Sequence, residues 1–194
     1  MGFWDAVRGR RNVSGPNLDA LFAVPSAAIT LQTSIDLLPV GTGSVCFRAA
    51  EGAAFRQTQA DVVELINADP EAPDVQETTD SYGFTWLTVT RDPGDVPGIC
   101  TDLHAVNTAL EEQGFGSGLL CTLVPFADGG GRRVGLVYLY RKGTFYPFAP
   151  RGSDHGSNER DNLLEIQVRD ALAGELPVEK DLQSWLAVWG APGL

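Results

Sequence analysis

The residues best suited to chemistry are Cys100 and His104, which lie four positions apart in a segment with helical periodicity. At that spacing both side chains lie on one helix face, and Cys46 and Cys121 offer two further ligands for a tetrahedral zinc ion. However, Cys46 lies in VCF and Cys121 in LLCTLV, where a reduced cysteine packs as a small apolar residue. Three cysteines without a CxxC pair indicate free thiols. We therefore expect neither a metal site nor a bound cofactor.

The sequence lacks the spacing of hydrolytic and phosphate-binding motifs. Asp102 and His104 are two positions apart on the expected helix, so their side chains point about 200° away from each other and cannot form the usual catalytic pair. Phe115 occupies the first glycine position of a GxSxG elbow around Ser117. The glycine-rich run 114–118 follows a helix and precedes a strand, the reverse of a phosphate-binding loop. The sequence therefore names no catalytic residue.

Composition excludes one class of partner. The chain has 194 residues, 43% of them hydrophobic, and a formal net charge of -11. So acidic a surface repels polyanions, and we expect no nucleic-acid partner. Residues 1–12 have no apolar signal core, and we expect no membrane-spanning stretch and a cytoplasmic protein.

Residues 1–15 form a basic and aromatic N-terminal segment that differs from the acidic remainder. Six of its residues are the expected contact with a partner or with a membrane surface: Phe3, Trp4, Val7, Arg8, Arg10 and Arg11. The aromatic side chains would enter an interface while the arginines supply attraction to anionic groups. We expect this short segment to be flexible when free and the protein to be peripheral at the inner face of the membrane. The alternative is a helix docked on its own core.

Residues 16–194 are predicted to form a single α+β domain, an antiparallel sheet with helices packed on it. Alternating or β-rich runs predict five strands, at 43–50, 82–90, 119–126, 133–141 and 144–149. Apolar residues at helical spacing predict three helices, at 55–67, 97–113 and 158–173. Pro147 places the last strand at an edge of the sheet.

Residues 17–40 are harder to interpret. Residues 17–24 predict a short helix that stops before Pro25. Beyond it, one alternating apolar set favours a strand: Ala27, Ile29 and Leu31. A helical face would collect a different set: Ile29, Leu31, Ile35 and Leu38. We favour the strand for residues 26–40, and the helix remains the alternative.

Aromatic residues gather near the C-terminus. The series in the last two expected strands is interpreted as core plus partner surface: Tyr138, Tyr140, Phe145, Tyr146 and Phe148. The terminal DLQSWLAVWGAPGL exposes too much aromatic surface for a free linker, so Trp185 and Trp189 are predicted to pack on the body of the protein.

Several segments taken in order resemble one family. NLDALFAVPSAA, GSVCFRAAEGAAF, DSYGFTW, TDLHAVN, KGTFYPFAP and WGAPGL together are similar to PspAB, the actinobacterial PspA-associated protein family. The resemblance runs nearly end to end. It implies a setting, envelope stress and association with the membrane-coating protein PspA, and it carries over no activity, cofactor or catalytic residue.

Two functions therefore stand at this point. We favour a non-enzymatic adaptor that binds PspA or another envelope-stress protein. The alternative is a small-ligand-binding or hydrolytic α+β domain, which an apolar pocket lined by convergent polar groups would support.

Overall fold

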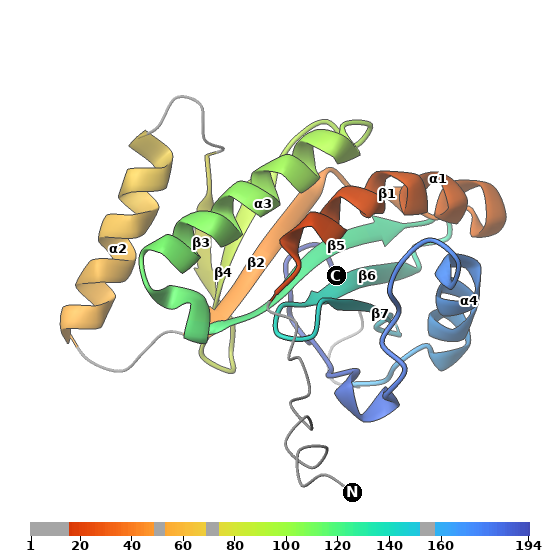
Figure 1. Ribbon diagram of the computed structural model, residues 1–194. Helices are drawn as coiled ribbons and strands as arrows, with labels where there is room; N and C mark the ends of the chain where they lie inside the picture. The colour runs from red at the N-terminus through yellow and green to blue at the C-terminus, as the bar shows by residue number, and fades with distance from the viewer. Residues whose placement is uncertain (1–15, 49–52, 69–73, 152–157) are drawn as a thin grey trace, which may run out of the picture.

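The computed structural model describes residues 16–48, 53–68, 74–151 and 158–194, and its centre is one antiparallel sheet (Figure 1). The sheet has seven strands: β1 Leu38–Pro39, β2 Thr42–Arg48, β3 Gln76–Thr79, β4 Phe84–Thr90, β5 Leu119–Ala127, β6 Arg133–Leu139 and β7 Thr144–Phe148. Their order is β3-β4-β2-β5-β6-β7, and β1 pairs with β5. The predicted single α+β domain with an antiparallel sheet is confirmed. Pro147 lies in β7, an edge strand, as predicted.

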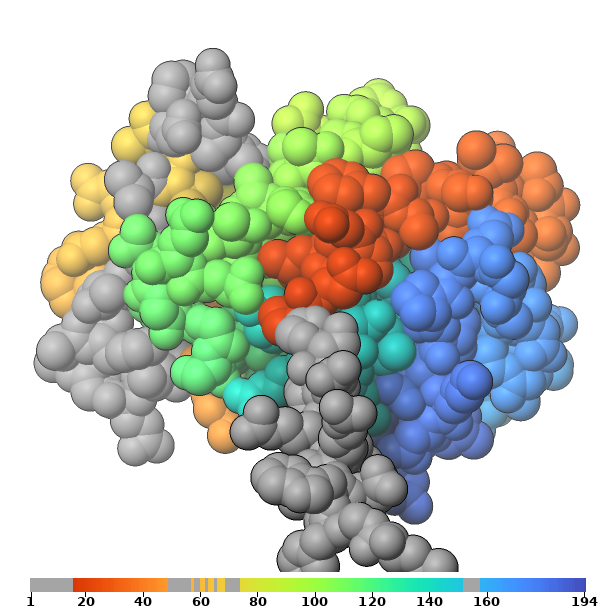
Figure 2. Space-filling view, viewed as in Figure 1, coloured from red at the N-terminus to blue at the C-terminus, as the bar shows by residue number. Residues whose placement is uncertain are grey.

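The helices pack on one face of this sheet. They are α1 Val24–Ile35, α2 Ala53–Ala68, α3 Val96–Glu112 and α4 Asn162–Leu172, and a 3-10 helix, Leu18–Ala23, leads into α1. Asp95 and Asp161 begin α3 and α4, because each carboxylate accepts a hydrogen bond from a backbone N–H three residues on. Figure 2 shows α1 and α3 side by side on the near surface, with little of the sheet visible between them.

The larger core lies between the sheet and these helices. Ile99, Leu103, Val106 and Leu110 form the apolar stripe of α3, and all four are buried. Leu164, Val168 and Leu172 do the same for α4, as their spacing predicts. Fully burying one such side chain contributes about 1.5–3 kcal/mol, so this face supplies a large part of the driving force for folding.

The prediction of a strand at 26–40 was wrong, because most of this segment belongs to α1. Pro25 occupies the first turn of the helix, where a missing N–H costs nothing, so it begins α1 instead of stopping the preceding turn. Buried residues recur at helical spacing on the side facing α3 and α4: Leu21, Val24, Ala27, Ala28 and Leu31. Ile29, part of the alternating set, is 65% exposed. Only Leu38–Pro39 forms a strand there.

Leu18–Ile35 is long and apolar enough to cross a membrane by length and composition alone, contrary to our expectation from the sequence. In this structure its buried side packs into the helix-covered core, which is the arrangement of a core helix in a globular domain.

The opposite face of the sheet carries a second apolar cluster. Side chains from β2, β4, β5, β6 and β7 contribute to it, among them Cys46, Trp86, Cys121, Val137 and Tyr146. Its cover is not a helix but the C-terminal tail, residues 177–194, with one 3-10 turn at Leu182–Ser184. Trp185 is buried there and Trp189 packs against the same cluster, so the predicted return of both tryptophans to the body is confirmed.

Candidate functional site

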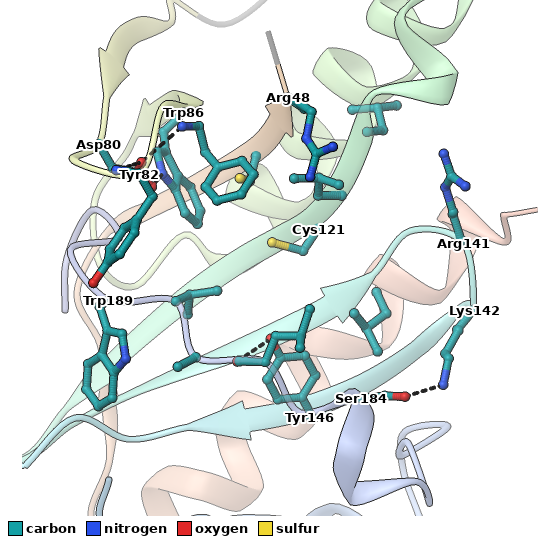
Figure 3. Close-up of a pocket in the computed structure, with 18 of the residues that line it drawn as sticks. Arg48, Asp80, Tyr82, Trp86, Cys121, Arg141, Lys142, Tyr146, Ser184 and Trp189 are labelled. Carbon is teal, nitrogen blue, oxygen red and sulfur yellow. Dashed lines mark hydrogen bonds between the residues drawn. The ribbon is translucent and has the colours of Figure 1, made fainter. Parts of the chain in front are cut away.

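A cavity of about 550 Å³ lies between the tail-covered face of the sheet and the C-terminal tail. β2, β4, β5, β6 and β7 supply its floor, and residues 183–189 form one wall. Figure 3 shows the lining side chains turned toward a common space, with Cys121 near its middle. We call this cavity the tail pocket.

Two cysteines and two aromatic residues define the floor of the tail pocket. Cys46 and Cys121 are direct partners across the antiparallel pair β2–β5. A hydrogen bond between the two thiols, together with burial, raises the pKa of Cys46 far above its ordinary value, so the Cys46 thiol carries no charge at neutral pH. Trp86 lies opposite Cys46 on β4, and Tyr146 comes from β7. The floor is therefore apolar, with sulfur and aromatic groups as its polarisable parts.

The polar atoms of the floor are engaged with the protein. The Trp86 indole N–H donates to Asp80 Oδ2 at 2.9 Å. The other Asp80 carboxylate oxygen accepts from the backbone N–H of Tyr82 and of Phe84. Although burial opposes them, these bonds lower the pKa of Asp80. The Tyr146 hydroxyl donates to the Leu186 carbonyl at 2.9 Å.

Three exposed cationic side chains line one end of the tail pocket, which we call its mouth. Arg48, Arg141 and Lys142 line it, and Asp80 is the one carboxylate among the lining residues. In Figure 3 the two arginines lie on one side of Cys121, and the rings of Tyr82 and Trp189 lie on the other. On a chain of net charge -11 this is a local reversal of sign.

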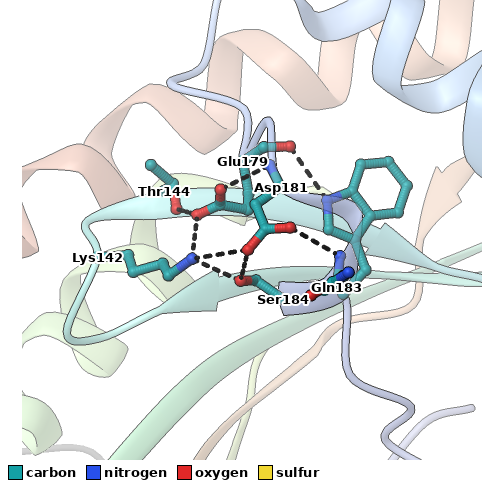
Figure 4. A network of polar contacts seen from close by, with 7 residues as sticks. Lys142, Thr144, Glu179, Asp181, Gln183 and Ser184 are labelled. Carbon is teal, nitrogen blue, oxygen red and sulfur yellow. Dashed lines mark hydrogen bonds and ion pairs between the residues drawn. The ribbon is translucent and has the colours of Figure 1, made fainter.

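A polar network ties the start of the tail to the β6–β7 turn (Figure 4). Lys142 Nζ lies 3.3 Å from Glu179 and 3.9 Å from Asp181, and Thr144 donates to Glu179 at 2.8 Å. Burial of Glu179 raises its pKa, but hydrogen bonds from Asp181, Thr144 and Lys142 outweigh it and lower the pKa overall. The network therefore favours the carboxylate form. We call it the tail latch.

Other contacts hold the rest of the tail. The Trp185 indole N–H donates to the Glu179 carbonyl at 3.1 Å, and its ring stacks on Tyr146 with centroids 6.0 Å apart. Arg160 donates to the Trp185 carbonyl at 2.6 Å. Trp189 meets Phe148 edge-on with ring centroids 4.8 Å apart. The wall of the tail pocket is thus fixed by side chains and not by a regular ladder of backbone bonds.

The groups considered for zinc are separated by the sheet. Cys100 packs in the helix-covered core, whereas Cys46 and Cys121 lie on the tail-covered face. His104 stacks on Phe22, with ring centroids 5.1 Å apart. Within the ranges that the structure describes, no three metal-ligating side chains come together.

The relay considered for hydrolysis is not assembled either. Asp102 accepts two hydrogen bonds from Arg91, while His104 approaches Asp19 at 3.5 Å. Ser184 at the tail pocket accepts from Lys142 and donates to Asp181. Lys142 forms the ion pairs of the tail latch, so its charge has a structural role.

All five residues of the aromatic series are buried, so the exposed partner surface predicted on them was wrong. Tyr138, Tyr140 and Phe145 pack in the helix-covered core, while Tyr146 and Phe148 belong to the tail-covered face. All five are less than 5% exposed. Alternation along β6 and β7 sends successive side chains to opposite faces, and both faces are covered.

Sequence reasoning missed the tail pocket, although one pattern pointed to it. β2, β4, β5 and β6 are apolar on both faces, whereas a half-solvated antiparallel strand alternates apolar and polar residues. Such strands require a second cover. The six predicted contact residues, Phe3, Trp4, Val7, Arg8, Arg10 and Arg11, lie outside the described residues.

Comparison with known proteins agrees with the resemblance seen in the sequence. No curated protein and no solved structure matches the chain. The family model described as PspAB, PspA associated protein B, matches residues 1–193. That match covers essentially the whole chain, and the protein belongs to the PspAB family.

Proposed function

We propose that this PspA-associated protein is a non-enzymatic binding protein that acts at the cytoplasmic side of a stressed envelope and binds an apolar ligand in the tail pocket. One observation carries the ligand-binding part: a cavity of about 550 Å³ with an apolar floor and polar groups at its mouth. Small-molecule sites have volumes of about 300–1,000 Å³, and they too are lined mainly by apolar side chains with a few polar groups.

The state of the polar groups supports binding over reaction. The carboxylate of Asp80, the hydroxyl of Tyr146 and the amine of Lys142 each have protein partners. Groups held in this way can orient a ligand, whereas a nucleophile and base need a free path to the reacting atom.

A neutral fluorescent probe tests this proposal. N-phenyl-1-naphthylamine fluoresces in apolar sites, and we expect saturable binding to the full chain. Leu139→Trp, which fills the tail pocket from β6, should weaken that binding at least tenfold. Leu163→Trp is the matched control, because Leu163 lies on α4 and is 66% exposed. Unchanged binding by the Leu139 variant, or no binding by the parent chain, contradicts the proposal.

The adaptor role is a second part of the proposal, supported by family membership and by the charge of the N-terminal segment. Phe3, Trp4 and Val7, with Arg8, Arg10 and Arg11, would contact PspA or the inner face of the membrane. Deletion of residues 1–12 tests it by thermal stability and by co-sedimentation with PspA or with anionic vesicles. Loss of binding at unchanged stability supports the contact. A destabilised truncation that still binds contradicts it.

A further inference from the structure

The two arginines at the mouth of the tail pocket have no anionic partner among the described residues. Arg48 lies over the Phe84 ring, with its guanidinium carbon 5.9 Å from the ring centroid. Arg141 donates to the Ser117 carbonyl. Neither contact neutralises a charge. By contrast, the third cation, Lys142, is paired with two carboxylates of the tail latch.

The single carboxylate of the lining does not neutralise them either. Asp80 accepts hydrogen bonds from Trp86, Tyr82 and Phe84, all of them in or beside β4. Its charge is therefore stabilised by neutral donors. Among the residues that the structure describes, the mouth therefore keeps two cations without an ion pair, on a chain of net charge -11.

From this mouth the tail pocket leads over a mostly apolar floor toward an aromatic end, where the Asp80 carboxylate lies beside Tyr82 and Trp86 (Figure 3). Leu120, Cys121 and Leu139 are among its lining residues, and in Figure 3 Tyr82 and Trp189 lie on the other side of Cys121 from the arginines. Its neighbour Cys121 and its burial raise the pKa of Cys46 above its ordinary value, so its thiol stays protonated at neutral pH and above. A charged group would lose its hydration along this floor, whereas a hydrocarbon chain would gain from leaving water.

We infer that the ligand is a single-chain anionic amphiphile, whose carboxylate or phosphate head is held by Arg48 and Arg141 and whose chain lies along the floor of the tail pocket. This inference rests on the proposed function and adds the class of ligand. Guanidinium groups suit both heads, because their planar N–H donors match carboxylate and phosphate oxygens. The enclosing tail favours one chain from solution over the flat surface of a bilayer.

Chain length and head charge separate this ligand from other occupants. We expect dodecanoate and dodecyl phosphate, below their micelle concentrations, to displace N-phenyl-1-naphthylamine from the full-length chain. Dodecyltrimethylammonium should be at least tenfold weaker, and inorganic phosphate alone should not displace the probe. Affinity should rise about fourfold for each methylene added between octanoate and dodecanoate. Whichever of dodecanoate and dodecyl phosphate binds with the higher affinity identifies the natural headgroup.

Two variants assign the preference to the arginines. The double variant Arg48→Met and Arg141→Met should lose the preference for anions and keep its affinity for the neutral probe. Arg169→Met is the matched control, since Arg169 on α4 pairs with Asp170 away from the tail pocket. Circular dichroism and thermal melting verify that each variant is folded.

The outcomes are distinct. Equal binding of cationic and anionic amphiphiles, or an anion preference that survives in the double variant, overturns the inference and leaves the proposed function standing. Failure of the neutral probe to bind the parent chain overturns the proposed function itself.

Discussion

The helix-covered and tail-covered faces of the sheet bury similar residue types to different effect. Under α1, α3 and α4, leucine and valine side chains at regular helical spacing interlock with the strands and are buried almost completely. Under the tail, two tryptophans and a few apolar residues cover a broader aromatic floor and leave the tail pocket. Regular elements bring an apolar residue to the interface every three or four positions, whereas an irregular strap contacts it only at anchor points. On this difference we assign stability to the helix-covered face and the proposed binding to the tail-covered face.

The largest expected effect comes from truncating one leucine on each face. Leu103→Ala removes a completely buried side chain from α3 and should lower the free energy of unfolding by about 3 kcal/mol. Leu139→Ala, at the partly open tail pocket, should lower it by less than about 1 kcal/mol, because the site already contains a cavity. Urea unfolding of both variants measures the difference. Equal losses would break the comparison between the two faces.

The tail latch should have a smaller effect on global stability. Lys142→Met removes the cation shared by Glu179 and Asp181, but Lys142 is 44% exposed, so solvent already screens these pairs. We expect a loss of about 1 kcal/mol or less in the free energy of unfolding. Hydrogen exchange should rise in residues 179–189 and stay unchanged in α3. Lys180→Met, at the only other lysine, is the control.

Acidification should sharpen the same contrast. Hydrogen bonds and Lys142 hold the pKa values of Glu179 and Asp181 below their ordinary 4.5 and 3.8. A lowered folded-state pKa stabilises the protein above the unfolded value, and this stabilisation is lost as the pH falls through the folded value. Trp185 should therefore change its fluorescence below pH 4.5, before the helical circular dichroism does. Simultaneous loss of both signals would show that the tail is as firmly held as the helices.

Chelator and reductant should have the smallest effect, namely none. The thiols of Cys46, Cys100 and Cys121 are free and buried, and burial raises the pKa of Cys100 to about 12. Thermal melting with and without EDTA and dithiothreitol should give the same midpoint. A large shift would reveal a bound metal or a disulfide.

The sequence predicted most of the helix-covered face and little of the other. The spacing of Ile99, Leu103 and Val106 predicts α3, because residues four and three positions apart lie on one face only when the segment is helical. The segment that contains α1 was misjudged because Ala27, Ile29 and Leu31 also alternate, and only packing against α3 and α4 decides between the two periods.

The tail pocket depends on contacts between segments distant in the chain. Cys46 and Cys121 become neighbours through strand pairing, and Trp185 reaches Tyr146 through the latch at Glu179. No pattern of residues close together in the sequence predicts these long-range contacts. Strands that are apolar on both faces require a second cover, but this pattern does not tell which segment provides it or where it leaves a cavity.

The tryptophan indole N–H signals test the central claim most directly. The chain has four tryptophans, of which Trp86 and Trp189 line the tail pocket and Trp4 lies in the N-terminal segment. Titration of ¹⁵N-labelled protein with N-phenyl-1-naphthylamine should shift the indole resonances of Trp86 and Trp189 in a saturable way, because its rings enter beside them. Trp4, assigned with Trp4→Phe, should not move. Saturable shifts at Trp4 with Trp86 and Trp189 unchanged would contradict the assignment of binding to the tail-covered face.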